Sequence, residues 1–359
     1  MKKYIVIIVS PSLSMGGVER ASANTANGLI NLDSNLEVVF LSIFNKEKFF
    51  ELDRRVICIQ PDDFNIEKLD FIKTLAYIRR NIHKYKSTSS DLSILVFGKF
   101  YGALTSIAIL GVNISFFISD RNSPLFRWRF PFNIFNKIAY TLNPPKGVIA
   151  QTEIAAYYQK KYFKKSKIQV IPNSVRDVTL YPEVKRKNVI LAVGRLNDYL
   201  KGFDLLLESV ALLHNQDWEL HIAGGDENGE ALKQQANTLG IRHRVKFLGK
   251  IKEIDRCYAY AGIYVIPSRS EGFPNALLEA MAAGCPCISF NFTAGPQDII
   301  THNYDGILVP NGAVDKLAQA IDALIVNDTL RLKISGNALE VRERYGIEKI
   351  VHAIQAFMS

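Results

Sequence analysis

The sequence predicts an α/β protein built from two doubly wound, Rossmann-like domains. Short apolar runs that suit buried parallel strands alternate along the chain with segments of helical periodicity. A length of 359 residues gives room for about two domains with sizeable cores. The hydrophobic fraction of 48% and the charged fraction of 22% are those of an ordinary globular protein.

The expected strands follow a similar pattern in both halves. In the first half they are Tyr4–Val9, Glu37–Ile43, Val56–Gln60, Ser93–Phe97, Ser115–Ile118 and Gly147–Ala150. In the second half they are Asn188–Val193, Glu219–Ala223, Val245–Leu248, Tyr264–Ile266, Cys287–Phe290 and Gly306–Leu308. Helices are expected between them, for example at Gly17–Leu32 and Phe203–Leu213.

Two apolar segments could be mistaken for targeting or membrane segments. Residues 1–10 start with two lysines, but the apolar run is only about six residues and no small-residue cleavage site follows, so we expect a buried first strand. Residues 100–119 carry no charge, but Gly111 and Asn113 divide them into a helix and a strand. We therefore expect no transmembrane segment.

The domain boundary is expected at Val170–Lys187, where an apolar stretch passes into a charged, proline-containing one. This places an N-terminal domain at residues 1–175 and a second domain at residues 186–345. Ligands of open α/β folds bind outside the carboxyl ends of the strands, so we expect the two domains to face each other across a cleft.

The basic excess is confined to the first half. Residues 1–180 hold 25 Lys and Arg against 14 Asp and Glu, or +11, whereas the rest of the chain holds 19 against 21, or −2. We expect this half to face an anionic membrane surface or a phosphate-bearing lipid. No nucleic-acid-binding motif is present, so nucleic acid is not an expected partner. A merely well-solvated basic surface is the alternative interpretation.

The four cysteines, Cys58, Cys257, Cys285 and Cys287, form no metal-binding or disulfide pattern. A reducing, cytoplasmic setting fits them best. The pair Cys285 and Cys287 falls in an apolar run and is expected in the core.

The stretch EGFPNALLE carries the strongest functional signal. Glu271 and Glu279 are separated by seven residues and follow a strand-like run, Gly262–Pro267. Pro274 suits the first turn of a helix, so one carboxylate stands in a strand-to-helix loop and the other in the helix. Unpaired backbone N–H groups between them would suit a diphosphate. Two unrelated surface glutamates are the alternative.

Two further strand-to-helix loops carry candidates for anion binding. In the first, Gly16 and Gly17 would let an anion approach the helix, with Arg20 one turn on; the loop lacks the dinucleotide GxGxxG pattern, and a purely steric role is the alternative. In the second, Arg195 ends a strand and Lys201 precedes Gly202 and the next helix. The planar guanidinium of arginine can form two parallel hydrogen bonds to a diphosphate, and the lysine ammonium adds a compact positive charge.

A membrane-facing segment is expected next to these loops. Aromatic and cationic side chains alternate along this segment, in the order Phe126, Arg127, Trp128 and Arg129. Such a pattern suits a membrane interface. The alternative is that the rings belong to the core and the arginines are simply solvated.

The motifs VGRL…KG and PSRSEGFPNALLEAMAAGCPCI resemble those of the family 4 retaining glycosyltransferases of GT-B architecture, and GGVER is similar to the first loop of that family. The resemblance covers nearly the whole chain and is most specific from Val193 to Asp305. It implies that Glu271 contacts the donor sugar, that Glu279 binds the nucleotide ribose, and that Arg195 and Lys201 bind the diphosphate. The remaining donor-binding positions that it implies are Gly272, Phe273, Pro274, Asn275, Ala276 and Leu277.

The resemblance also implies the absence of a metal and a final helix, residues 346–359, that crosses back onto the first domain; Gly346–Phe357 is indeed amphipathic in pattern. One loop departs from the family: Arg121 stands where related lipid-linked oligosaccharide transferases carry a histidine. Because arginine cannot act as a base at neutral pH, we assign Arg121 an acceptor- or phosphate-binding role, together with Gly16, Gly17 and Arg20.

The expected protein is a glycosyltransferase, peripheral on the cytoplasmic face of a bacterial plasma membrane. It would move a hexose or N-acetylhexosamine from a nucleotide diphosphate sugar, UDP-linked in our expectation, to a saccharide on a polyprenyl diphosphate during capsule, O-antigen or glycan synthesis. Glu271, Arg195 and Lys201 are the expected catalytic residues. The alternatives are a nucleotide-sugar 2-epimerase of the same fold and a non-catalytic subunit that binds sugar nucleotide or lipid.

Overall fold

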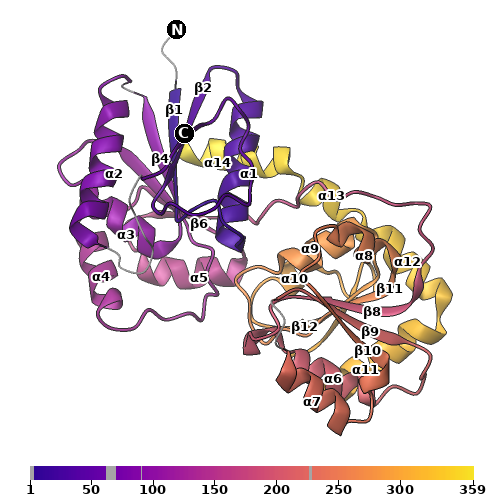
Figure 1. Ribbon diagram of the computed structural model, residues 1–359. Coiled ribbons are helices and arrows are strands. Elements are labelled where there is room, and N and C mark those ends of the chain that lie inside the picture. Colours follow the sequence, from indigo (N-terminus) through magenta and orange to yellow (C-terminus); the bar gives the residue numbers. More distant parts are fainter. Residues whose placement is uncertain (1–3, 62–69, 90, 226–228) are drawn as a thin grey trace. The chain divides into compact units, whose positions relative to one another are not determined.

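The computed structural model describes residues 4–61, 70–89, 91–225 and 229–359. The chain divides into two compact units: Met1–Ser174 with Tyr345–Ser359, and Val175–Arg344 (Figure 1). Each unit contains one parallel sheet flanked by helices. The predicted α/β class with two doubly wound sheets is confirmed.

The N-terminal unit is built around seven strands in the order β3-β2-β1-β4-β5-β6-β7. These strands are β1 Tyr4–Ser10, β2 Leu36–Ser42, β3 Ile57–Ile59, β4 Leu92–Phe97, β5 Ser115–Ser119, β6 Gly147–Ala150 and β7 Lys167–Val170. Its helices are α1 Gly17–Leu32, α2 Phe71–Lys86, α3 Lys99–Ala108, α4 Phe132–Leu142, α5 Glu153–Tyr162 and, from the end of the chain, α14 Ile347–Met358.

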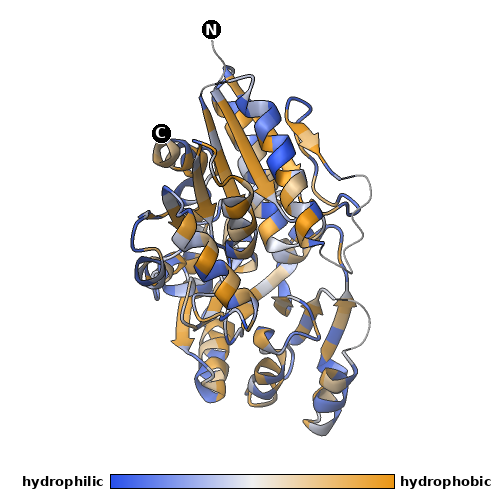
Figure 2. Ribbon diagram, turned by 90° about the vertical axis from the view of Figure 1, so that its left-hand side faces the viewer, coloured by the Kyte–Doolittle hydropathy of each residue, from blue (hydrophilic) through white to orange (hydrophobic). Residues whose placement is uncertain are grey.

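Alternate side chains of the central strand β1 enter cores on opposite faces of this sheet. Val6 and Ile8 pack with α1 and α14, whereas Ile5, Ile7 and Val9 pack with α2, α3 and α4. A Cβ on Gly28 would lie 2.5 Å from Val351 Cγ2, so glycine is what lets α14 pack so closely on α1. Figure 2 shows the strands mostly in the hydrophobic colour and the helices in both colours, as expected of buried parallel strands.

The C-terminal unit contains six strands in the order β10-β9-β8-β11-β12-β13. These are β8 Lys187–Val193, β9 Glu219–Ala223, β10 Val245–Gly249, β11 Ala261–Ile266, β12 Cys287–Asn291 and β13 Ile307–Pro310. The helices are η1 Tyr199–Lys201, α6 Phe203–Ala211, α7 Glu230–Thr238, η2 Arg242–Arg244, α8 Ile254–Tyr260, α9 Asn275–Ala282, α10 Pro296–Ile299, α11 Val314–Val326, α12 Asp328–Ala338 and α13 Val341–Arg344.

Most of the predicted strands agree with the observed ones to within one or two residues, but three predictions need correction. The edge strand β7 was missed, because its polar pattern, Lys-Ile-Gln-Val, resembles a loop. Helix α6 ends at Ala211 instead of Leu213. Strand β11 begins at Ala261, one residue before the strand-like run Gly262–Pro267 and three before the predicted start at Tyr264, because alanine and glycine are depleted in strands and give a weak signal.

The two ambiguous apolar segments are resolved as predicted. Residues 4–10 form β1, and residues 100–119 contain most of α3 and all of β5. Across the described parts of the chain, no helix combines the length and apolarity needed to cross a membrane. Cys285 and Cys287 are fully buried, as predicted.

Candidate active site

The order of strands in the C-terminal unit reverses between β8 and β11. In doubly wound sheets such a switch point leaves a crevice outside the carboxyl ends of the two strands, and ligands bind there. The loops that follow β8 and β11 contain Arg195, Lys201 and Glu271. The topology therefore brings the predicted donor-binding loops together.

The loop after β8 is shaped by glycine at its end. Gly202 has φ +66°, and a Cβ there would lie 2.0 Å from the carbonyl oxygen of Pro267. No side chain fits this left-handed position. The short helix η1, which ends at Lys201, is thus held against the end of β11.

Lys201 and Glu271 meet at this point. Lys201 Nζ lies 3.0 Å from Glu271 Oε1, and the Ser268 hydroxyl donates to the same oxygen at 2.6 Å. Both side chains are mostly buried, with exposed fractions of 21% and 12%. An ammonium, a carboxylate and a hydroxyl are therefore preorganised within one hydrogen-bonded group.

Arg269 holds the two loops in register. Its guanidinium forms two hydrogen bonds to the Asp204 carboxylate, of 2.7 and 2.6 Å, and stacks 3.8 Å from the ring of Tyr199. Its backbone N–H also donates to the carbonyl of Leu200. Burial opposes ionisation of Asp204, but the bond to Arg269 prevails and lowers the pKa of that carboxyl.

Arg195 is not part of this group in the structure. Its side chain is 80% exposed and pairs with Asp198 at 2.7 Å, three residues further on. It would have to leave Asp198 before it could contact a diphosphate bound beside Lys201.

The start of α9 offers fewer unpaired N–H groups than the sequence suggested. The N–H of Asn275 donates to the carbonyl of Phe273, and that of Leu277 to the carbonyl of Pro274. Pro274 is the N-cap residue and Phe273 is buried, whereas Gly272 remains partly exposed. Two of the N–H groups between Glu271 and Glu279 are therefore already paired, and the donor-binding role of Asn275, Ala276 and Leu277 stays a prediction.

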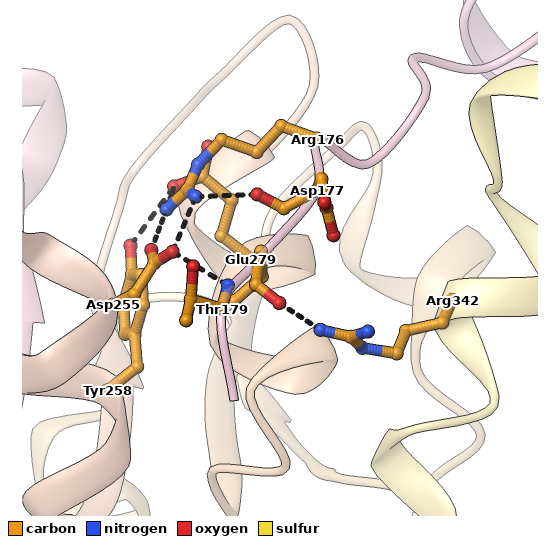
Figure 3. A network of polar contacts seen from close by, with 8 residues as sticks. Arg176, Asp177, Thr179, Asp255, Tyr258, Glu279 and Arg342 are labelled. Atoms are coloured by element: carbon orange, nitrogen blue, oxygen red, sulfur yellow. Dashed lines mark hydrogen bonds and ion pairs between the residues drawn. The ribbon is translucent and has the colours of Figure 1, made fainter. Parts of the chain in front are cut away.

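Glu279 lies inside a buried polar network (Figure 3). It is 5% exposed, and one of its carboxylate oxygens lies 3.3 Å from Arg176 Nη2 and 3.5 Å from the Tyr258 hydroxyl. Arg176 also binds both oxygens of Asp255, which in turn accepts the N–H of Thr179 at 2.9 Å. Burial alone would lower the pKa of Arg176, but Asp255 and Glu279 raise it above its ordinary value.

In the N-terminal unit, the turn with Gly16 and Gly17 already holds an anion from the chain itself. A Cβ on Gly16 would lie only 2.2 Å from Glu19 Oε2. Burial raises the pKa of the Glu19 carboxyl, against the opposing effects of a backbone hydrogen bond and of Lys46. Arg20 lies 5.7 Å from the ring of Phe50. The structure therefore places a carboxylate where the sequence suggested a ligand phosphate.

Arg121 points inward. Its guanidinium donates to the Asn173 side chain and lies 5.3 Å from the ring of Phe97. Burial lowers the pKa of Arg121 to about 9, although Asp120 opposes the effect. Its acceptor-binding role remains a prediction, and this conformation would have to change for its guanidinium to reach a ligand.

The aromatic segment divides between core and surface. Phe126 is 50% exposed, and Arg127 and Arg129 are also exposed. Trp128 instead packs against the core, with its ring 5.3 Å from Phe100 and 5.2 Å from Phe126. A membrane contact by Trp128 would require it to leave these rings, whereas the other three side chains already face solvent.

The sequence missed the residues that hold the predicted ones in place: Arg176, Asp255, Tyr258, Ser268 and Arg269. Ser268 and Arg269 lie three and two residues before Glu271, so their position in the same loop was the available signal. Arg176 and Asp255 come from distant parts of the chain, and nothing in the sequence links them.

Among the residues that the structure describes, no three His, Cys, Asp or Glu side chains are grouped to hold a metal ion.

Known proteins resemble this chain along its whole length. Residues 180–341 match the family described as "Glycosyl transferases group 1". An uncharacterized glycosyltransferase of Haemophilus influenzae is 30% identical, and the match covers 98% of both chains. A Campylobacter jejuni enzyme, the GalNAc-α-(1→4)-GalNAc-α-(1→3)-diNAcBac-PP-undecaprenol α-1,4-N-acetyl-D-galactosaminyltransferase, is 24% identical over 98% of this chain and 96% of its own. The solved structure of Anabaena HepE in complex with UDP has a TM-score of 0.78 at 19% identity and covers 99% of both chains. Because its identity is only 19%, the similarity to the HepE structure shows a shared fold and nothing more.

Proposed function

Because this chain belongs to the group 1 glycosyl transferases, we propose that it moves a hexose or N-acetylhexosamine from a UDP-sugar to a saccharide carried on a polyprenyl diphosphate. The acceptor class is supported by the Campylobacter relative, whose name describes transfer to an undecaprenol-linked saccharide. Bacterial surface polysaccharide or glycan synthesis is the proposed setting.

The observation that carries this proposal is the Lys201–Glu271 ion pair at the switch point of the C-terminal sheet. An ammonium that is mostly buried beside a single carboxylate can exchange that carboxylate for a diphosphate oxygen at little cost in desolvation. Glu271, released from Lys201, then accepts hydrogen bonds from hydroxyls of the donor sugar. Arg195 turns from Asp198 toward the same diphosphate, and the start of α9 adds its dipole.

Glu279 is proposed to accept the ribose hydroxyls of the nucleotide. The Arg176 guanidinium holds this buried carboxylate in place, so Glu279 needs no reorganisation when the ligand arrives. Asp255 has a supporting role, because it holds Arg176 through two hydrogen bonds.

In the reaction, the bond between the anomeric carbon and the bridging diphosphate oxygen breaks, and its electron pair leaves with UDP. The acceptor hydroxyl oxygen forms the new bond with retained configuration, and its proton passes to the departing diphosphate. Lys201 and Arg195 stabilise the charge that develops on the leaving oxygen. The side chains of this chain supply the positive charge, so we propose a mechanism without a metal.

The test is a donor screen with purified protein and an extracted pool of lipid-linked saccharides, in which UDP release and the mass of the glycolipid are measured. We expect one UDP-sugar to release UDP only when the pool is present, and the glycolipid to gain the mass of one sugar. An epimerised donor without any glycolipid product would instead indicate an epimerase. A complete lack of turnover with all UDP-sugars would contradict the choice of nucleotide.

Peripheral attachment to an anionic membrane is the second part of the proposal. Around α4 the large apolar side chains of Leu125, Phe126, Phe130, Ile134, Ile138 and Leu142 are exposed. Arg127, Arg129 and Lys137 are exposed among them. Rings and aliphatic chains beside cations suit the boundary between headgroups and acyl chains.

Vesicle co-sedimentation measures this attachment. Phe130 is 77% exposed, so Phe130→Ser should leave the fold intact and weaken binding to phosphatidylglycerol vesicles by about tenfold or more. Val326, 79% exposed in the other unit, gives the matched control, and Val326→Ser should bind as the wild type does. Equal vesicle binding by both variants would show that the surface around α4 does not contact the membrane.

A further inference from the structure

A pocket of about 680 Å³ lies within the N-terminal unit. Lys99, the first residue of α3 after β4, and Asp120, which directly follows β5, place it at the carboxyl edge of the sheet. Helices α4 and α5 supply other walls. The lining residues used below are Lys99, Asp120, Arg127, Trp128, Asn136 and Gln159. None of the acceptor-binding residues suggested by the sequence, Gly16, Gly17, Arg20 or Arg121, belongs to this lining.

The walls of this pocket carry buried polar atoms with unmet hydrogen-bonding capacity. Both side-chain atoms of Asn136, the indole N–H of Trp128 and Oε1 of Gln159 lack partners among the described residues. Asn136 is only 1% exposed. Each such atom costs the fold about 1–3 kcal/mol, so four of them on one pocket indicate groups kept for a ligand.

A cation without an ion pair lies at the same pocket. Lys99 Nζ lies 3.2 Å from the centroid of the Tyr162 ring, and in the described part of the chain it has no carboxylate within ion-pair distance. Burial lowers the pKa of Lys99 to about 8, against the opposing charge of Asp120. With Arg127 and Lys161 also in the lining, three cations face one carboxylate.

These features restrict the chemistry of the ligand. Sugar hydroxyls both donate and accept hydrogen bonds, so they can satisfy the amide of Asn136, the indole N–H and Gln159 together. Trp128 and Tyr158 add flat apolar walls, which suit the C–H faces of a pyranose ring. The excess of cations suits a phosphate next to the sugar.

We propose that this pocket binds the sugar of the acceptor and the phosphate attached to it. The inference rests on the proposed function, because it assigns the acceptor of that reaction to these residues. Phe126 and Arg127 belong both to the pocket lining and to the exposed surface around α4, so a polyprenyl chain could leave the pocket directly along the surface proposed to meet the membrane.

Soluble sugar 1-phosphates test the pocket separately from catalysis. The donor site is first saturated with UDP, and binding of glucose, galactose, mannose, N-acetylglucosamine and N-acetylgalactosamine 1-phosphates is then measured by saturation-transfer NMR and calorimetry. At least one of them should bind the wild type in the presence of UDP. Asn136→Leu should weaken that binding at least tenfold, because leucine fills the same space without hydrogen-bonding groups.

Thr74→Val is the matched control. The Thr74 hydroxyl is also buried without a partner among the described residues, but it lies on α2 outside the pocket lining. This variant should bind the sugar phosphate as the wild type does, and both variants should melt at or above the wild-type temperature. Binding that Asn136→Leu leaves unchanged, or no binding of any of the five compounds, would overturn the pocket assignment.

The UDP titration that precedes these measurements reports on the proposed function by itself. UDP binding without any second ligand would reject the pocket and leave the donor site intact. Failure of UDP to bind would reject the donor site, whatever the sugar phosphates do.

Discussion

At the carboxyl edge of the C-terminal sheet, the candidate donor-binding side chains already have partners: Lys201 pairs with Glu271, Arg195 with Asp198, and Glu279 with Arg176. The pocket of the N-terminal unit is the reverse: within the described parts of the chain, four of its polar atoms lack hydrogen-bond partners and Lys99 has no ion pair. A ligand of the first region must displace the partners of Lys201 and Arg195, whereas a ligand of the second supplies hydrogen bonds that the pocket lacks. Mutations should therefore destabilise the first region and stabilise the second.

The largest effect is expected from breaking the buried network around Glu279. Arg176→Leu removes the cation that pairs with both Asp255 and Glu279, so two buried carboxylates lose their ion pair. Removal of one partner of a buried ion pair costs about 3–5 kcal/mol, so chemical denaturation should show a loss of that size. UDP affinity should fall as well. A variant as stable as the wild type would show that the network does not hold Glu279.

The next effect is on turnover. Lys201→Ala should lower kcat by about 10²–10³-fold, because one charge that stabilises the leaving diphosphate is lost. Lys246 is a suitable control, since it forms an exposed pair with Glu219 in the same unit, and Lys246→Ala should retain wild-type turnover. Near-normal activity of Lys201→Ala in a folded protein would remove Lys201 from the diphosphate site.

Substitution in the N-terminal pocket should have the opposite sign. Lys99→Met removes a desolvated cation, so at pH 7 the free energy of unfolding should rise by on the order of 1–3 kcal/mol while sugar phosphate binding falls. A variant that loses binding and gains stability cannot owe the loss to misfolding. A destabilised Lys99→Met would contradict the idea that Lys99 is kept for a ligand.

The same lysine predicts a pH dependence. Burial lowers the pKa of Lys99 from 10.5 to about 8, with Asp120, Arg127, Tyr162 and Tyr140 around it. Binding of a sugar phosphate should therefore weaken above about pH 8. Between about pH 8 and 10.5 Lys99 is protonated in the unfolded chain but has lost its proton in the folded one. The free energy that burial of its charge costs the folded state is therefore lost across this window, and the free energy of unfolding should rise with pH. Both trends should be absent in Lys99→Met.

The smallest effect is expected from metal removal. Both regions use lysine and arginine as their cations, so EDTA should change the initial rate of UDP release by less than about twofold. A loss of activity that Mg²⁺ restores would show that the side chains alone do not supply the charge at the diphosphate.

The sequence predicted the sheets well because a strand buried on both faces is a continuous apolar run, as in Tyr4–Ser10 and Cys287–Asn291. It failed at Lys167–Val170, an edge strand with polar side chains, since only pairing with β6 marks it as a strand. Local pattern therefore sufficed for the central strands and for the more apolar edge strands β3, β10 and β13, but not for the polar edge strand β7.

For the candidate site, the sequence singled out Lys201, Glu271 and Glu279 through their loops, but not the side chains that hold them. Arg176 lies 103 residues before Glu279, and only the fold brings the two together. The N-terminal pocket was missed for a similar reason. The side-chain amide of Asn136 lacks a partner among the described residues because of what surrounds it in the fold, and the sequence near it gives no sign of this.

The most direct test is a crystal structure of the protein with UDP. The account predicts a diphosphate at the carboxyl ends of β8 and β11, with Lys201 Nζ turned from Glu271 to a phosphate oxygen and the ribose hydroxyls bonded to Glu279. UDP bound in another place, with the Lys201–Glu271 pair undisturbed, would contradict it.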